Sequence, residues 1–266
     1  MNETPETSTD QVPEPAQLDQ EEPPQLREVS KDELRMIIEA HKTWLTTEGK
    51  EGKQANLIRA NLQEADLGGA DLQKADLLEA NLQEANLGRA NLQEANLHAA
   101  NLRKANLHAA NLQNTSLHAA NLQEAYLFNA NLQKAGLLEA NLQEANLGDA
   151  NLQKAGLRAA NLQNANLRAA NLQEADLFNA NLQEADLFNA NLQEANLGDA
   201  NHLQGANPQA ARFFTRSQVK RAANWQLAFY SRDFLEKLSL SADHNDKVKM
   251  KLAEIEKKKK KSVAKP

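Results

Sequence analysis

Leucine occupies every fifth position from Leu57 to Leu197, which makes 29 consecutive repeats of five residues. Five residues advance an α-helix by about 500°, so leucines at this spacing would drift around a helix axis. In a straight strand an odd spacing would send alternate leucines to opposite faces. The chain must therefore turn once per repeat, so that all leucines point inward while the chain winds into stacked coils.

The residues before each leucine are nearly as constant. Alanine stands two positions before it, with Thr115 as the one departure. Leucine and alanine together predict a narrow apolar core that is stable only when several coils stack. Asparagine or aspartate directly precedes the leucine. These are turn-compatible residues: asparagine can hydrogen-bond nearby backbone and tolerate unusual dihedrals, and asparagines stacked one coil apart can form ladders. The exceptions at this position are Ser116, Tyr126, Gly136 and Gly156.

A second rhythm of ten residues predicts the number of sides. Repeats of the form Asn-Leu-Gln alternate with variable ones such as ADLGG, ANLHA and AYLFN. Four repeats per coil would separate the two kinds onto opposite pairs of faces, whereas three would mix them in every column. We therefore expect four sides.

The pattern A(D/N)LXX resembles that of the pentapeptide-repeat family, and the match extends from Ala55 to Asp199. The resemblance implies an all-β solenoid, a right-handed quadrilateral β-helix. The 29 repeats would form about seven coils, with a helical cap at each end. The N-terminal extension with His41 and Trp44 is similar to those of bacterial members, and NWQLAFYSRDFLEKLSL is similar to the C-terminal tails of cyanobacterial members.

The flanks predict caps and charged tails. Ser30 with Glu33 forms a capping box, followed by apolar residues at helical spacing. Residues 1–28 carry eight acids and one base, whereas 247–266 carry nine lysines and two acids. We expect an acidic, proline-rich disordered tail (1–29), a capping helix and linker (30–54), the β-helix (55–211), a helical C-terminal cap (212–240) and a charged helix with a lysine-rich tail (241–266).

Aromatic residues become dense only after the array. We interpret them as a cap packed across the last coil, and homodimerisation through that cap is the alternative that the resemblance to gyrase-interacting members offers. The lysines Lys257 to Lys261 are interpreted as a solvated tail, with electrostatic binding of nucleic acid or an anionic membrane as the alternative. The aromatic residues concerned are Phe213, Phe214, Trp225, Phe229, Tyr230 and Phe234.

No constellation for chemistry is evident. The chain has no cysteine, and the phosphate-binding GxxxxGK, the dinucleotide-binding GxGxxG and the nucleophile motif GxSxG are absent. Four sides would place His98 and His118 on one face and His108 opposite, and we interpret all three as outward histidines without a metal. We predict a protein that is not an enzyme and has no cofactor. The N-terminus lacks the pattern of a secretory signal, so the expected location is cytoplasmic.

Departures from the repeat indicate where a partner could bind. Phe128, Phe178 and Phe188 follow their leucines and are predicted to face outward, Phe128 and Phe188 on one face and Phe178 opposite, without forming one compact patch. One Asn-Leu-Gln face carries an acidic column that Lys104 and Asn164 interrupt. The glutamates of this column are Glu64, Glu84, Glu124, Glu144 and Glu184.

The leading hypothesis is a non-enzymatic interaction or scaffold protein with an unknown protein partner. The alternative is a DNA mimic that binds DNA gyrase or another topoisomerase, as the resemblance to gyrase-protecting members implies. Those members carry phenylalanine at some core centres and often contain loops, whereas leucine fills every centre here and no insertion occurs before position 202. The array has 17 acids and 9 bases, an excess that also suits simple solubility.

Overall fold

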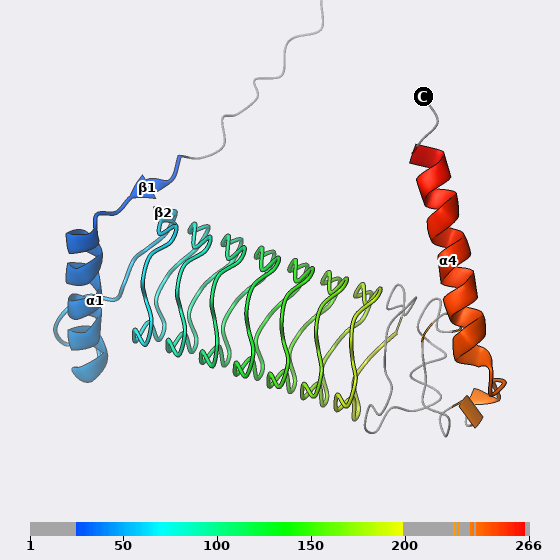
Figure 1. Ribbon diagram of the computed structural model, residues 1–266. Helices are drawn as coiled ribbons and strands as arrows, with labels where there is room; N and C mark the ends of the chain where they lie inside the picture. Colours follow the sequence, from blue (N-terminus) through cyan, green and yellow to red (C-terminus); the bar gives the residue numbers. More distant parts are fainter. Residues whose placement is uncertain (1–24, 199–225, 227, 229–234, 237, 264–266) are drawn as a thin grey trace, which may run out of the picture.

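The computed structural model describes residues 25–198, 226, 228, 235–236 and 238–263. The coils stack into a rod, with helix α1 (Lys31–Thr46) at its N-terminal end and helix α4 (His244–Val263) beyond the other end (Figure 1). Strand β1 (Arg27–Glu28) pairs in parallel with β2 (Ala60–Asn61) on the first coil. No helix among the described residues is long and apolar enough to cross a membrane.

The register between coils is twenty residues. Parallel bridges join Asn101 to Asn121 and Asn121 to Asn141, and the same spacing holds from Asn56 to Asn196. Each coil therefore contains four repeats, which confirms the four sides predicted from the ten-residue rhythm. We name each face after its first central leucine: the Leu57 and Leu67 faces carry the variable repeats, and the Leu62 and Leu72 faces carry the Asn-Leu-Gln repeats.

Every backbone N–H of a typical repeat finds an acceptor, as residues 101–105 illustrate. The N–H groups of Leu102 and Lys104 donate to the next coil at 2.7 and 2.9 Å, and that of Asn101 donates to the preceding coil at 2.9 Å. The Ala105 N–H closes a turn on the Leu102 carbonyl at 3.0 Å. The fifth, that of Arg103, donates to the Asn101 side chain at 3.2 Å. Buried backbone is thus satisfied without long strands.

The core consists of leucine and alanine, as expected. No central leucine from Leu57 to Leu197 is more than 2% exposed. Thr115, the departure from alanine, is also buried, and its hydroxyl donates to the Leu92 carbonyl at 2.7 Å. The hydroxyl is tolerated in the core because this bond satisfies it.

The unusual dihedrals lie after each leucine rather than directly before it. The residue two places after each leucine has a positive φ, between 52° and 63° at the non-glycine positions from Arg59 to Glu194. Together with the bond from the alanine N–H to the leucine carbonyl, this is the signature of a type II turn. The asparagine before the leucine lies in the bridge between coils and does not have a positive φ.

The predicted asparagine ladders do form. On the Leu62 face the Nδ2 group of each asparagine from Asn81 to Asn181 donates to the Oδ1 atom twenty residues earlier, at 3.0 to 3.4 Å. The Leu72 face carries a similar unbroken ladder from Asp71 to Asn191. On the variable faces Tyr126 and the residues Ser116, Gly136 and Gly156 interrupt the ladders.

At the N-terminal end, α1 packs against the first coil. Ser30 caps the helix by accepting a bond from the Glu33 N–H at 3.1 Å, and Leu34, Ile37 and Ile38 contact the core. The predicted disordered tail of residues 1–29 extends too far, because Arg27 and Glu28 form β1. At the other end, residues 199–225 and most of residues 227–237 lie outside the described residues. The predicted β-helix extends into this part of the chain, so the count of about seven coils stays a prediction.

The positive φ gives a testable consequence at two adjacent alanines. Ala119 is exposed with φ 55°, whereas Ala120 is buried in the core. We expect Ala119→Gly to raise the free energy of unfolding by up to about 1 kcal/mol, because glycine adopts this conformation without a Cβ clash. Ala120→Gly should lower it by about 1 kcal/mol. Urea unfolding followed by circular dichroism measures both, and equal effects would contradict the assignment of the turn.

Candidate interaction surfaces

The glutamate column lies on the Leu62 face, at the positive-φ position of each repeat. Glu124 forms ion pairs with Arg103 at 3.2 Å and with Lys104 at 3.6 Å. Two bases therefore neutralise the middle of the column. The remaining members form two separate pieces, Glu64 with Glu84 on one side and Glu144 with Glu184 on the other, so the face has no continuous acidic stripe.

The Leu67 face brings two of the predicted phenylalanines together. Phe128 and Phe188 both line a shallow hollow of about 320 Å³, together with Arg168. Gly148 also lines the hollow and is buried. The Phe128 ring lies so close to it that a Cβ at this position would come within 3.1 Å of the ring. Phe178 lies on the opposite face, so the three phenylalanines form no single patch, although Phe128 and Phe188 line the same hollow.

An arginine accompanies two of the phenylalanines in the same geometry. Arg168 stacks 4.7 Å above the Phe188 ring and pairs with Asp186 at 3.0 Å. The aspartate carboxylate in turn accepts the Phe188 N–H at 3.0 Å.

The opposite, Leu57 face repeats this arrangement. Arg158 stacks 4.7 Å above Phe178 and pairs with Asp176 at 3.4 Å, and the Phe178 N–H donates to Asp176 at 3.1 Å. Cation–π contacts of this kind hold a guanidinium in place at low entropic cost. Sequence reasoning missed both pairs, although the recurrence of arginine eighteen residues before Asp-Leu-Phe could have revealed them.

The histidines extend the same two faces toward the N-terminal end. His108 stacks on Phe128 with a centroid separation of 6.0 Å, and Tyr126 lies beside both rings. His98 and His118 meet edge to face at 6.4 Å on the Leu57 face. The His118 ring occupies the place that a Cβ of residue 136 would need, which explains Gly136. No group of three ligating side chains suited to a metal occurs among the described residues.

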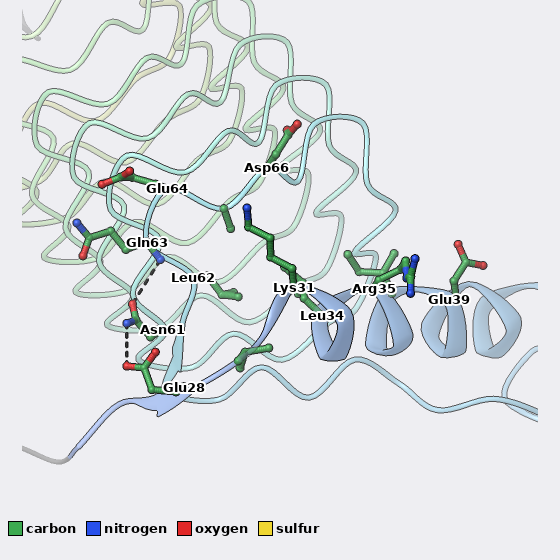
Figure 2. A pocket seen from close by; sticks show the side chains of 13 residues that line it. Glu28, Lys31, Leu34, Arg35, Glu39, Asn61, Leu62, Gln63, Glu64 and Asp66 are labelled. Carbon is green, nitrogen blue, oxygen red and sulfur yellow. Dashed lines mark hydrogen bonds between the residues drawn. The ribbon is translucent and has the colours of Figure 1, made fainter.

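A deeper groove of about 750 Å³ lies where α1 meets the first coil (Figure 2). Leu34 and Ile38 of α1 form one wall, and the coil edge from Asn61 to Asp66 forms the other. Glu28 accepts a bond from the Asn61 side chain at 2.9 Å, which ties β1 to this edge. Sequence reasoning assigned no site here.

His41 joins α1 to the first repeat. It is fully buried, stacks on Trp44, and its Nδ1 atom accepts the Ala55 N–H at 3.0 Å. Burial lowers the pKa of His41 below 6.5, an effect that the Gln73 carbonyl and the Asp71 carboxylate oppose only in part. The neutral form of His41 therefore holds the helix in place.

The C-terminal aromatic residues proposed as cap or dimer contacts lie outside the described residues. These are Phe213, Phe214, Trp225, Phe229, Tyr230 and Phe234.

The fold and its surfaces define a solenoid of four-sided coils. The family model described as pentapeptide repeats matches eight copies, over residues 53–89, 80–118, 120–158, 155–193 and 180–213. The chain belongs to the pentapeptide-repeat family, as the sequence pattern predicted. A comparison with curated proteins gives no match.

Solved structures of pentapeptide repeat proteins are similar to this chain. HetL, involved in heterocyst differentiation regulation in the cyanobacterium Nostoc sp. strain PCC 7120, is 40% identical over 55% of this chain and 72% of its own, with a TM-score of 0.32. A protein from the Arabidopsis thaliana thylakoid lumen is 29% identical over 35% of this chain and 64% of its own, with a TM-score of 0.34. QnrB1, a plasmid-mediated fluoroquinolone resistance protein, is 13% identical over 70% of this chain and 97% of its own, with a TM-score of 0.54, a likeness of fold alone.

The lowered pKa of His41 predicts that acid loosens α1. An unfolded histidine gains its proton near pH 6.5, whereas buried His41 resists protonation until a lower pH. The stabilisation is therefore complete above pH 6.5 and is lost as the pH falls below 6.5 toward the folded pKa. The protection factor of the Ala55 amide against hydrogen exchange should fall over this range.

Matched variants separate this effect from general acid sensitivity. His41→Gln removes the titrating group and should flatten the pH dependence of the Ala55 protection factor. His98→Gln changes an exposed histidine and should leave the pH dependence intact. The same pH dependence in both variants would refute the role of His41.

Proposed function

We propose that this protein is a non-enzymatic interaction or scaffold module that binds a protein partner through its variable faces. The observation that carries this proposal is the hollow on the Leu67 face, where Phe128 and Phe188 are both half-buried and flank Gly148. Aromatic and arginine side chains fixed on a rigid surface are the residues that contribute most to protein–protein affinity. Because the rod already holds these side chains in place, little side-chain conformational entropy is lost when a partner binds.

The other two faces support this division of roles. Their asparagine amides are engaged in ladders along the rod, and on the Leu72 face Gln133 also bonds to Gln113 and Gln153 at 3.3 and 2.9 Å. Amides that already bond to one another gain little from a new partner. Recognition is therefore assigned to the variable faces, with Phe178 and Arg158 as the contact pair on the Leu57 face.

The flanks complete the proposal. We propose that α1 and the aromatic C-terminal segment act as caps that oppose end-to-end association of rods. The C-terminal segment is also the proposed contact for a homodimer. The lysine-rich segment is proposed to be a solvated tail, with electrostatic binding of nucleic acid or an anionic membrane as the alternative, and the proposed location is cytoplasmic.

A DNA mimic that binds gyrase is the alternative function. The fold shared with QnrB1 and the acidic excess of the array favour it. Its electrostatic basis is weak, however, because Arg103 and Lys104 pair with Glu124 in the middle of the column. Regularly spaced phosphates are poorly imitated by two short acidic stretches.

The partner-binding proposal predicts a face-specific loss of binding. A double variant, Phe128→Ala with Phe188→Ala, should reduce capture of the native partner from lysate about tenfold, because two aromatic contacts are removed. The matched control, Gln113→Ala with Gln153→Ala on the Leu72 face, should capture the partner as the unaltered chain does. Circular dichroism verifies that both variants fold, and undiminished capture by the phenylalanine variant would remove the support for this surface.

A supercoiling assay separates the two functions. We expect no inhibition of gyrase at micromolar protein, with or without a quinolone, because the acidic column is interrupted. Inhibition that disappears when Glu144 and Glu184 are replaced by glutamine would instead establish the DNA-mimic function.

A further inference from the structure

The N-terminal end of the rod is only partly covered. Of the repeat alanines from Ala55 to Ala195, all described, only Ala65 and Ala70 are not fully buried. These two alanines bound the Leu67 side of the first coil, so α1 and β1 leave this side less covered than the others, from the corner at Ala70 to the corner at Ala65. The groove shown in Figure 2 leads to the corner at Ala65.

This part of the first coil presents backbone groups that every later coil pairs. One coil further on, the Asn86 N–H donates to the Ala65 carbonyl at 2.9 Å, and the Asn86 and Gly88 carbonyls accept bonds from the first coil. The equivalent groups of the first coil are the Asp66 N–H and the carbonyls of Gln63, Asp66 and Gly68. Within the described part of the chain none of these has a hydrogen-bond partner.

The strand that could have paired these groups turns away. β1 lies beside Asn61 through Glu28, and the chain then enters α1 after Ser30. The missing neighbour is therefore one short extended segment beside residues 65–67, because residues 63–64 and 68–69 are the central residues of turns. Such a sheet edge binds an added strand through main-chain hydrogen bonds.

The side chains of the groove indicate which segment fits. Leu34 and Ile38 are partly exposed and provide an apolar wall. Of the lining charges, Arg35 is already paired with Asp32 at 3.2 Å. The carboxylates of Glu39, Glu64 and Asp66 form no ion pair among the described residues and outnumber the one remaining base, Lys31, which points toward the coil edge in Figure 2.

We propose that this groove binds an extended basic segment of a partner protein, which adds as a strand beside residues 65–67 and places apolar side chains against Leu34 and Ile38. The same end of a second copy is disfavoured, because it would bring the two sets of carboxylates together. The site lies at the first coil, whereas the hollow of Phe128 and Phe188 lies further along the rod, so the two proposals are tested independently.

The probe is a blocked hexapeptide of alternating lysine and valine, titrated into the full chain up to about 1 mM at low salt. We expect hydrogen exchange at the Asp66 amide to slow about tenfold when the peptide is bound, because that N–H gains an acceptor. A peptide with methylated backbone amides keeps the charges but cannot donate, and should bind at least about fivefold more weakly. A glutamate–valine peptide should not bind.

Two aspartates provide a matched pair of variants. Asp66 and Asp76 both accept bonds from a backbone N–H and from an asparagine one coil later, which asparagine could accept equally. Asp66→Asn should weaken peptide binding about two- to threefold at low salt, since one carboxylate of the groove is lost. Asp76→Asn, on the Leu57 face, should leave it unchanged.

Three results would overturn the proposal. One is no binding of the lysine–valine peptide, and another is equal binding of its methylated form, which would indicate attraction by charge alone. The third is self-association of the full chain that is lost when Lys257–Lys261 are deleted, which would identify a second copy as the occupant.

Discussion

The hydrogen bonding between coils is the constraint on which the rest of the structure depends. Three N–H groups of a typical repeat bond to neighbouring coils, a fourth closes the turn, and the fifth needs the asparagine side chain. No coil can satisfy its own backbone, so each is stable only between two others. The core follows from this requirement, because only small and uniform side chains allow four short walls to stack in register.

The alternation of asparagine and aspartate follows from the direction of the ladders. Each Nδ2 group donates toward the N-terminal end, so the first member of a ladder only needs to accept. Asp66 and Asp71 occupy these first positions, where a carboxylate serves as well as an amide, whereas Asp76 follows Asn56. Asp176 lies one coil after Gly156, which has no side chain to accept a hydrogen bond. The side chain at position 176 therefore only has to accept, and it does so from Asn196.

The sequence predicted the parts of the structure that depend on periodicity. A spacing of five requires a chain that turns at every leucine, and the ten-residue rhythm predicted four sides, because both patterns report which residues share an environment. The position of the positive φ could not be read from the sequence, since the glutamates, lysines and alanines that adopt it carry no preference for that conformation.

The surface features depend on details that a pattern does not contain. The Phe128 hollow exists because Gly148 lies one coil further along the same face, so that a ring can lean across it. How much of the first coil α1 covers depends on the direction in which the chain leaves β1. The helical propensity of residues 31–46 does not determine that direction. The terminal aromatic residues lie outside the described residues, and their assignment to a cap stays a prediction.

The common direction of the asparagine amides makes the rod electrically polar. Along the Leu62 and Leu72 faces each side-chain dipole points the same way, so their fields add along the axis as peptide dipoles do in a helix. The positive, amino end of these arrays lies at the first coil, where Glu28 and Asp71 meet it with carboxylates. The carboxylates of Glu28 and Asp71 therefore complement the positive end of the aligned amides. If one ladder ran in the opposite direction, the partly negative amide oxygen of its first asparagine would face a carboxylate instead.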